Sequence, residues 1–154
     1  MITRRTVDLS VYPDLIVIYL GIKVQSLKGF SSVLQLGPKI KKAIAAQPDG
    51  LLLHEPVLYS LLPLHVGMRQ YWRDFDSLEK WARSLPHKQW WADFLRQPSG
   101  VGFWHETYFA RGGFEAVYDG LDGPLGFLKF AREVPAEGAM FSARRRLRLP
   151  DQPE

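Results

Sequence analysis

The best candidates for chemistry in this sequence are two adjacent ionisable residues inside an aromatic segment. His105 and Glu106 lie in the run from Gly102 to Tyr108, whose composition is typical of a β-strand. Neighbours on a strand point to opposite faces of the sheet, so these two side chains cannot act on each other. Glu106 shares its face with Trp104 and Tyr108, whose rings carry polar atoms. We therefore expect these three residues to wall an apolar pocket, with Glu106 as the candidate general base and His105 as the alternative.

Glu106 also has a purely structural interpretation. A carboxylate on a buried strand can pair with a basic side chain, and Arg69 and Arg73 lie on or just after a predicted strand. Such an ion pair would stabilise the sheet and would have no catalytic role. Both interpretations of Glu106 are open at this point.

A second group of aromatic residues surrounds His87. Trp72 ends a predicted strand, and Trp91 follows His87 by about one helical turn. Large aromatic rings can wall a pocket for a flat apolar ligand, although they can equally form an ordinary core. His87 follows Pro86 at a predicted helix start, where the helix dipole disfavours a charged imidazole. A neutral His87 could act as a base or a ligand, or it could simply cap the helix.

The composition excludes several classes of site. The chain has no cysteine, which rules out disulfides, thiolate catalysis and cysteine-ligated metal sites. Its four histidines are scattered, without the close spacing of zinc or iron ligands, so no metal is predicted. Glycine-rich nucleotide-binding loops and a G-x-S-x-G element are also absent from the sequence.

The charge and hydropathy patterns bear on partners and location. The net charge of +4 comes from arginines near the two ends, and no nucleic-acid-binding motif accompanies them. The apolar run 15–22 is too short for a membrane span, and Asp8, Pro13 and Asp14 precede it where a signal peptide would be apolar. We expect a cytoplasmic protein that binds neither nucleic acid nor membrane.

The order of predicted elements indicates the fold class. Strands are expected at 15–24, 51–59, 66–72, 101–110 and 114–118, and helices at 29–46, 76–83 and from 86 onward. This α+β order is ferredoxin-like βαββαβ with an extra C-terminal strand, which we expect to form a hairpin with the strand before it. The expected organisation is an extended arm at 1–13, the folded domain at 14–120 and an irregular basic tail at 121–154.

The first long strand predicts a partner. Residues 15–24 are apolar on both faces of the strand, whereas helices of this fold cover only one face of the sheet. A second copy could cover the other face, so we expect a homodimer whose sheets face each other as a dimeric α/β barrel.

Several segments together resemble a known superfamily. They span roughly residues 12–130 and include Tyr71-Trp72-Arg73, the run Trp104-His105-Glu106-Thr107-Tyr108 and Glu115-Ala116-Val117-Tyr118. The chain resembles the dimeric α/β-barrel proteins, which include antibiotic-biosynthesis and haem-degrading monooxygenases, and in particular an uncharacterised monooxygenase-like family.

The resemblance implies an oxidoreductase that needs no cofactor and acts on a flat hydrophobic or aromatic molecule. Five aromatic residues are then the candidate substrate-binding residues: Trp72, Trp91, Trp104, Tyr108 and Tyr118. Two alternatives stay open. One is a haem protein with iron on His87 or His105, although Trp91 stands where the haem-degrading relatives place their iron ligand. The other is a non-catalytic module that binds a hydrophobic metabolite.

Overall fold

The chain divides into two compact units in the computed structural model. Residues 15–109 form one unit, and residues 1–14 together with 110–154 form the other. The structure describes residues 4–96, 100–111, 113–114, 116, 118–119, 124, 126–141 and 143–148.

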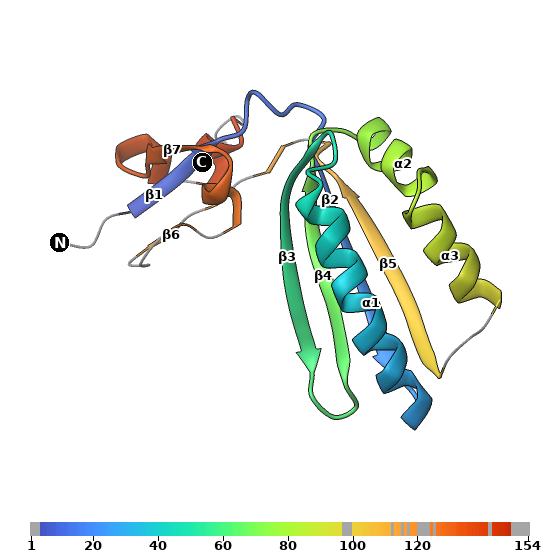
Figure 1. Ribbon diagram of the computed structural model, residues 1–154. Helices are drawn as coiled ribbons and strands as arrows, with labels where there is room; N and C mark the ends of the chain where they lie inside the picture. The colour runs from blue at the N-terminus through green and yellow to red at the C-terminus, as the bar shows by residue number, and fades with distance from the viewer. Residues whose placement is uncertain are drawn as a thin grey trace. The chain divides into compact units, whose positions relative to one another are not determined.

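The larger unit contains a four-stranded antiparallel sheet with the strand order β3-β4-β2-β5 (Figure 1). Its strands are β2 (Ile16–Val24), β3 (Leu51–Ser60), β4 (His65–Trp72) and β5 (Val101–Phe109). Helix α1 (Leu27–Ala45) connects β2 to β3, and α2 (Phe75–Arg83) and α3 (His87–Arg96) connect β4 to β5. The predicted βαββαβ core is confirmed, with each of these elements within a few residues of its expected bounds.

Local sequence explains where α2 begins. The side chain of Asp74 accepts a hydrogen bond from the Ser77 backbone N–H at 2.7 Å, which satisfies one of the free donors at the helix start. Arg73 donates to the Asp74 carboxylate at 2.8 Å, and these hydrogen bonds lower the pKa of Asp74 to about 2. The cap therefore stays ionised across the whole neutral range.

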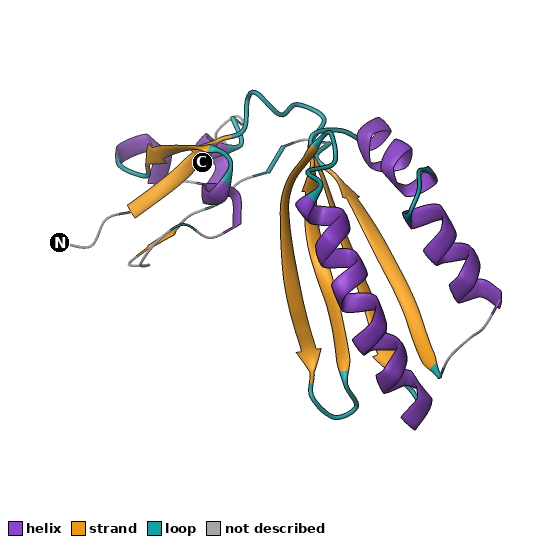
Figure 2. Cartoon of the chain, in the orientation of Figure 1, coloured by secondary structure: helices purple, strands orange, loops and turns teal. Residues whose placement is uncertain are grey.

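The two faces of this sheet differ. Helices lie on one face, where Leu78 packs into a buried cluster with Ile16 and Trp72 (Figure 2). We call the opposite face the open face and define it by Tyr19, Arg69, Trp104, Glu106 and Tyr108. Register supports this definition, since Tyr19 is paired with Arg69 on one side and Glu106 on the other.

The smaller unit holds a three-stranded sheet with the order β6-β1-β7, built from β1 (Arg4–Asp8), β6 (Tyr118–Asp119) and β7 (Arg132–Pro135). Two 3₁₀ helices (Gly126–Lys129 and Gly138–Phe141) and α4 (Ala143–Arg146) complete it. The segment expected as an extended arm thus supplies the central strand of a sheet. Thr6 on this strand is 2% exposed and donates to the Ala116 carbonyl oxygen at 2.9 Å.

The predicted hairpin between 101–110 and 114–118 was wrong. Strands do follow the βαββαβ core, but Tyr118 pairs with Arg5 of β1 and not with β5. The reason is that alternating side chains indicate a strand without indicating its partner, which depends on long-range contacts. Within the described residues, no helix combines the length and the apolar character that a membrane span requires.

Candidate functional site

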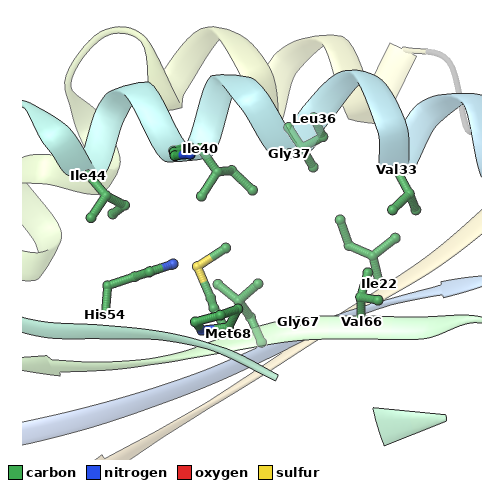
Figure 3. Close-up of a pocket in the computed structure, with 13 residues that line it drawn as sticks. Ile22, Val33, Leu36, Gly37, Ile40, Ile44, His54, Val66, Gly67 and Met68 are labelled. Atoms are coloured by element: carbon green, nitrogen blue, oxygen red, sulfur yellow. The ribbon is translucent and has the colours of Figure 1, made fainter. Parts of the chain in front are cut away.

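A cavity of about 420 Å³ lies between α1 and the helix-covered face of the sheet. Figure 3 shows Val33, Leu36, Ile40 and Ile44 reaching down from α1 toward the strands. The strand side of the lining comes from β2, β3 and β4: Leu20, Ile22, His54, Pro56, Val66, Gly67 and Met68. Cavities of this size and apolar character are typical of small-molecule sites.

His54 is the half-buried polar side chain of this lining. It rises from β3 into the space below Ile40 and Ile44 (Figure 3), whereas Lys41, the other titratable lining residue, is exposed. Burial lowers the pKa of His54 below its usual value of 6.5, with a smaller opposing effect from Glu55. The ring is therefore neutral at pH 7.

A chain of hydrogen bonds runs from the core to His54. Trp72, which is 0% exposed, donates from its indole nitrogen to the Gln70 side-chain oxygen at 3.1 Å. The Gln70 amide nitrogen lies 3.2 Å from Nδ1 of His54. Gln70 is only 1% exposed, and it stands opposite His54 in the β3–β4 register. Two buried side chains, Gln70 and Trp72, therefore fix the orientation of the His54 ring through this chain of hydrogen bonds.

The open face carries a second set of polar and aromatic groups. Arg69 donates to the Glu55 carboxylate at 3.0 Å and to the Tyr19 hydroxyl at 3.1 Å. Burial opposes the charge of Arg69, but these two hydrogen bonds raise its pKa overall. The Tyr108 hydroxyl donates to Glu106, and this bond raises the pKa of Tyr108.

The ion pair considered for Glu106 is not formed. Arg69 bonds to Glu55, and Arg73 bonds to Asp49 at 3.2 Å and to Asp74 at 2.8 Å. Among the described residues, the hydrogen-bond partner of Glu106 is the Tyr108 hydroxyl, and both residues are exposed.

Two facing glycines make room for an aromatic cluster on the open face. Gly21 and Gly67 are cross-strand partners, and a Cβ atom on Gly21 would clash with the Trp104 and His65 rings. Those rings are joined by a 2.8 Å hydrogen bond from the Trp104 indole to Nε2 of His65. Tyr59 packs against both, 4.5 Å from the His65 ring centroid, and its buried hydroxyl lacks a hydrogen-bond partner among the described residues.

The predicted site residues are placed as follows. Trp104, Glu106 and Tyr108 share one face, as their parity indicated, and His105 lies on the other face, exposed beside Phe103. These four residues are absent from the cavity lining, so their catalytic and binding roles stay predictions.

Trp72, Trp91 and Tyr118 were the other predicted substrate-binding residues. Trp72 is a fully buried core residue whose ring packs at a tilt against Trp81, with 5.5 Å between the ring centroids. The side chains of Trp91 and Tyr118 lie outside the described part of the chain.

His87 sits apart from the cavity. Its Nδ1 lies 2.9 Å from the Ala82 carbonyl oxygen, and its ring packs on Trp81 at 4.6 Å and near Trp90 at 6.3 Å. A carbonyl oxygen only accepts, so Nδ1 of His87 carries a proton and donates it to Ala82. Among the described residues, no cluster of three potential metal-ligating side chains is present.

Sequence reasoning missed His54 and Gln70. A signal was present, because Met68, Gln70 and Trp72 alternate onto one face and only the middle residue of the three is strongly polar. A lone amide on an apolar face needs a partner, which should have directed attention to the neighbouring strand.

Comparison with known proteins gives a family and a fold. Residues 15–127 match the model of a family described as monooxygenase af470-like. Two aldoxime dehydratase structures are each 20% identical to the chain. The structure of OxdRE in complex with butyraldoxime has a TM-score of 0.69, and the alignment covers 94% of this chain and 42% of that chain. The second structure has a TM-score of 0.67, and the alignment covers 86% of this chain and 39% of that chain. A conserved protein from Bacteroides thetaiotaomicron is 9% identical with a TM-score of 0.51, covering 63% of this chain and 98% of that one.

The aldoxime dehydratases are much longer proteins, since the alignments cover 39% and 42% of their chains. At these identities, the structural likeness concerns the fold alone. No curated protein matches the sequence.

Proposed function

Given that the chain belongs to the monooxygenase af470-like family, we propose that it is a monooxygenase-like enzyme that binds a flat hydrophobic or aromatic molecule beneath α1. The observation that carries the proposal is the cavity of about 420 Å³, whose lining is almost entirely aliphatic. Burial of an apolar ligand there would be driven by the removal of its surface from water.

The proposed reaction needs no cofactor because the substrate itself supplies the electrons. An electron-rich phenol or enol ionises, and the resulting anion reduces O₂ directly. A CH₂ group then becomes C=O, with one oxygen atom of O₂ entering the product and the other leaving as water. An apolar enclosure suits this chemistry because it protects the reactive intermediates from side reactions.

Haem is the alternative cofactor, and the histidines fit it poorly. The Nδ1 nitrogen of His87 is bonded to the Ala82 carbonyl oxygen, which leaves Nε2 as the ring nitrogen that could meet iron, but His87 is not among the residues that line the cavity. His54 lines the cavity, but its Nδ1 accepts from the Gln70 amide, so Nε2 carries the proton and has no lone pair for iron. His105 is exposed on the edge strand β5 and is also outside the lining. We therefore propose a reaction without haem, and a Soret band that survives purification and disappears in His87→Ala would overturn this choice.

Two neighbouring positions on α1 give a matched test of the cavity. Val33 faces the cavity, whereas Leu34 is 75% exposed and points away from it. Val33→Trp should fill the cavity and abolish both ligand binding and substrate-dependent oxygen uptake with quinol- or anthrone-type substrates. Leu34→Trp should leave both unchanged.

The two measurements also separate an enzyme from a binding module. Binding that is lost in Val33→Trp without any oxygen uptake by the unaltered protein would favour a module that only holds its ligand. Equal ligand binding by both tryptophan variants would refute the cavity as the site.

We also propose that the protein is a homodimer joined through the open face. The buried Tyr59 hydroxyl lacks a partner among the described residues, and Tyr108 is 48% exposed. A second copy would enclose these groups together with Glu106, which stays a candidate base from the sequence although it lies on the face opposite the cavity beneath α1. Light scattering at micromolar concentration should give twice the chain mass of 17.7 kDa. A stable monomer would contradict the dimer.

A further inference from the structure

We propose that His54 recognises the ligand as a neutral hydrogen-bond donor, so that the cavity selects a flat apolar molecule bearing one carbonyl, phenolate or enolate oxygen. This inference rests on the proposed function, because it assigns a ligand class to the cavity beneath α1. It concerns which ring nitrogen of His54 carries the proton, and two buried side chains, Trp72 and Gln70, determine that.

The first step is the orientation of the Gln70 amide. The Trp72 indole nitrogen can only donate a hydrogen bond, and Trp72 is 0% exposed. The atom 3.1 Å from it on Gln70 must therefore be the amide oxygen, which can only accept. This fixes the amide nitrogen of Gln70 on the side of His54.

The second step is the tautomer of His54. The Gln70 amide nitrogen can only donate, so Nδ1 of His54, 3.2 Å away, must accept. A neutral imidazole that accepts at Nδ1 carries its proton on Nε2. Burial lowers the pKa of His54, which keeps the ring neutral at pH 7 and leaves a single N–H to offer.

The third step is what Nε2–H meets. Nε2 has no hydrogen-bond partner among the described residues, and the lining around His54 is aliphatic apart from the exposed Lys41. A donor in an apolar enclosure favours a ligand acceptor and disfavours a ligand N–H group or cation. It would also stabilise the anion of an ionised phenol or enol.

The tautomer can be measured without any ligand. In ¹⁵N-labelled protein at pH 7, the imidazole correlations of His54, assigned by their loss in His54→Phe, should show the Nε2–H form. In Gln70→Glu, the carboxylate can only accept, so His54 should acquire a proton on Nδ1. An Nδ1–H form in the unaltered protein would overturn the proposal.

The ligand preference can be measured with fluorenone and fluorene, flat molecules that differ by one carbonyl oxygen. Fluorenone should bind about three- to tenfold more tightly, which corresponds to about 0.7–1.4 kcal/mol and to one neutral hydrogen bond. His54→Phe should remove this preference, so that the two probes bind with equal affinity. Equal binding of both probes to the unaltered protein would overturn the donor role alone. If neither probe bound, the proposed cavity site and the donor role would both be refuted.

Discussion

The buried amide of Gln70 should contribute measurably to stability. Gln70→Leu keeps a similar side-chain volume but removes the acceptor of the Trp72 indole N–H, which is 0% exposed. A buried donor left without a partner costs about 1–3 kcal/mol. The lost bond to the half-buried His54 adds up to about 1 kcal/mol, so we expect unfolding to become easier by about 2–3 kcal/mol.

Chemical and thermal denaturation should detect this change easily. For a chain of this size, about 2–3 kcal/mol corresponds to a fall in Tm of about 5–10 °C. Gln89→Leu is a suitable control, because Gln89 is exposed and its side-chain amide bonds to Asp93 four residues away on the same helix. It should change the free energy of unfolding by less than about 0.5 kcal/mol.

A double-mutant cycle identifies the cause. In a Trp72→Phe background the indole donor is already absent, so Gln70→Leu should cost about 1–2 kcal/mol less there than in the unaltered protein. An equal cost in both backgrounds would refute the reasoning, and so would a single variant Gln70→Leu that unfolds like the unaltered protein.

Four further predictions concern other positions. Gly67→Ala should lower stability in urea titrations by at least about 1–3 kcal/mol, because the added Cβ would clash with the backbone oxygen of Leu20; a neutral result would contradict the close strand approach. Because burial lowers the pKa of His54, the unfolded chain binds a proton at this residue more tightly than the folded chain does, so the free energy of unfolding should be highest above pH 6.5 and fall below it. His54→Phe should flatten this pH dependence, and parallel stability profiles of the variant and the unaltered protein would exclude His54 as its source. Asp74→Ala should lower the free energy of unfolding by about 0.5–2 kcal/mol at neutral pH, where the ionised carboxylate caps α2. Below the Asp74 pKa of about 2 the variant and the unaltered protein should be equally stable, because protonation has already weakened the cap, and melting curves at both pH values check this. Glu106→Gln should lower turnover by about two to four orders of magnitude with unchanged melting if this residue is the base, whereas unchanged oxygen uptake would exclude that role.

Local sequence patterns were sufficient for much of the larger unit. The apolar spacing of Val33, Leu36 and Ile40 predicts α1. A cap at Asp76 or Ser77 is what the sequence suggests for α2, whereas the capping residue is Asp74. Alternation along β5 separates His105 from Glu106, because a strand places neighbouring side chains on opposite faces whatever it pairs with. These features have periods of two or about four residues, so a short window of sequence contains all the information they need.

The candidate site depended on contacts that no short window contains. His54 and Gln70 are brought face to face by the β3–β4 register, and the same register pairs Glu55 with Arg69 and so removes the ion pair considered for Glu106. A shift of one residue would move every side chain of a strand to the other face, and turn geometry and packing decide against that shift. The sequence alone determined which residues share a face of each strand. Only the tertiary structure decided which face α1 covers, and therefore that the cavity forms around His54, because that choice depends on packing between segments far apart in the chain.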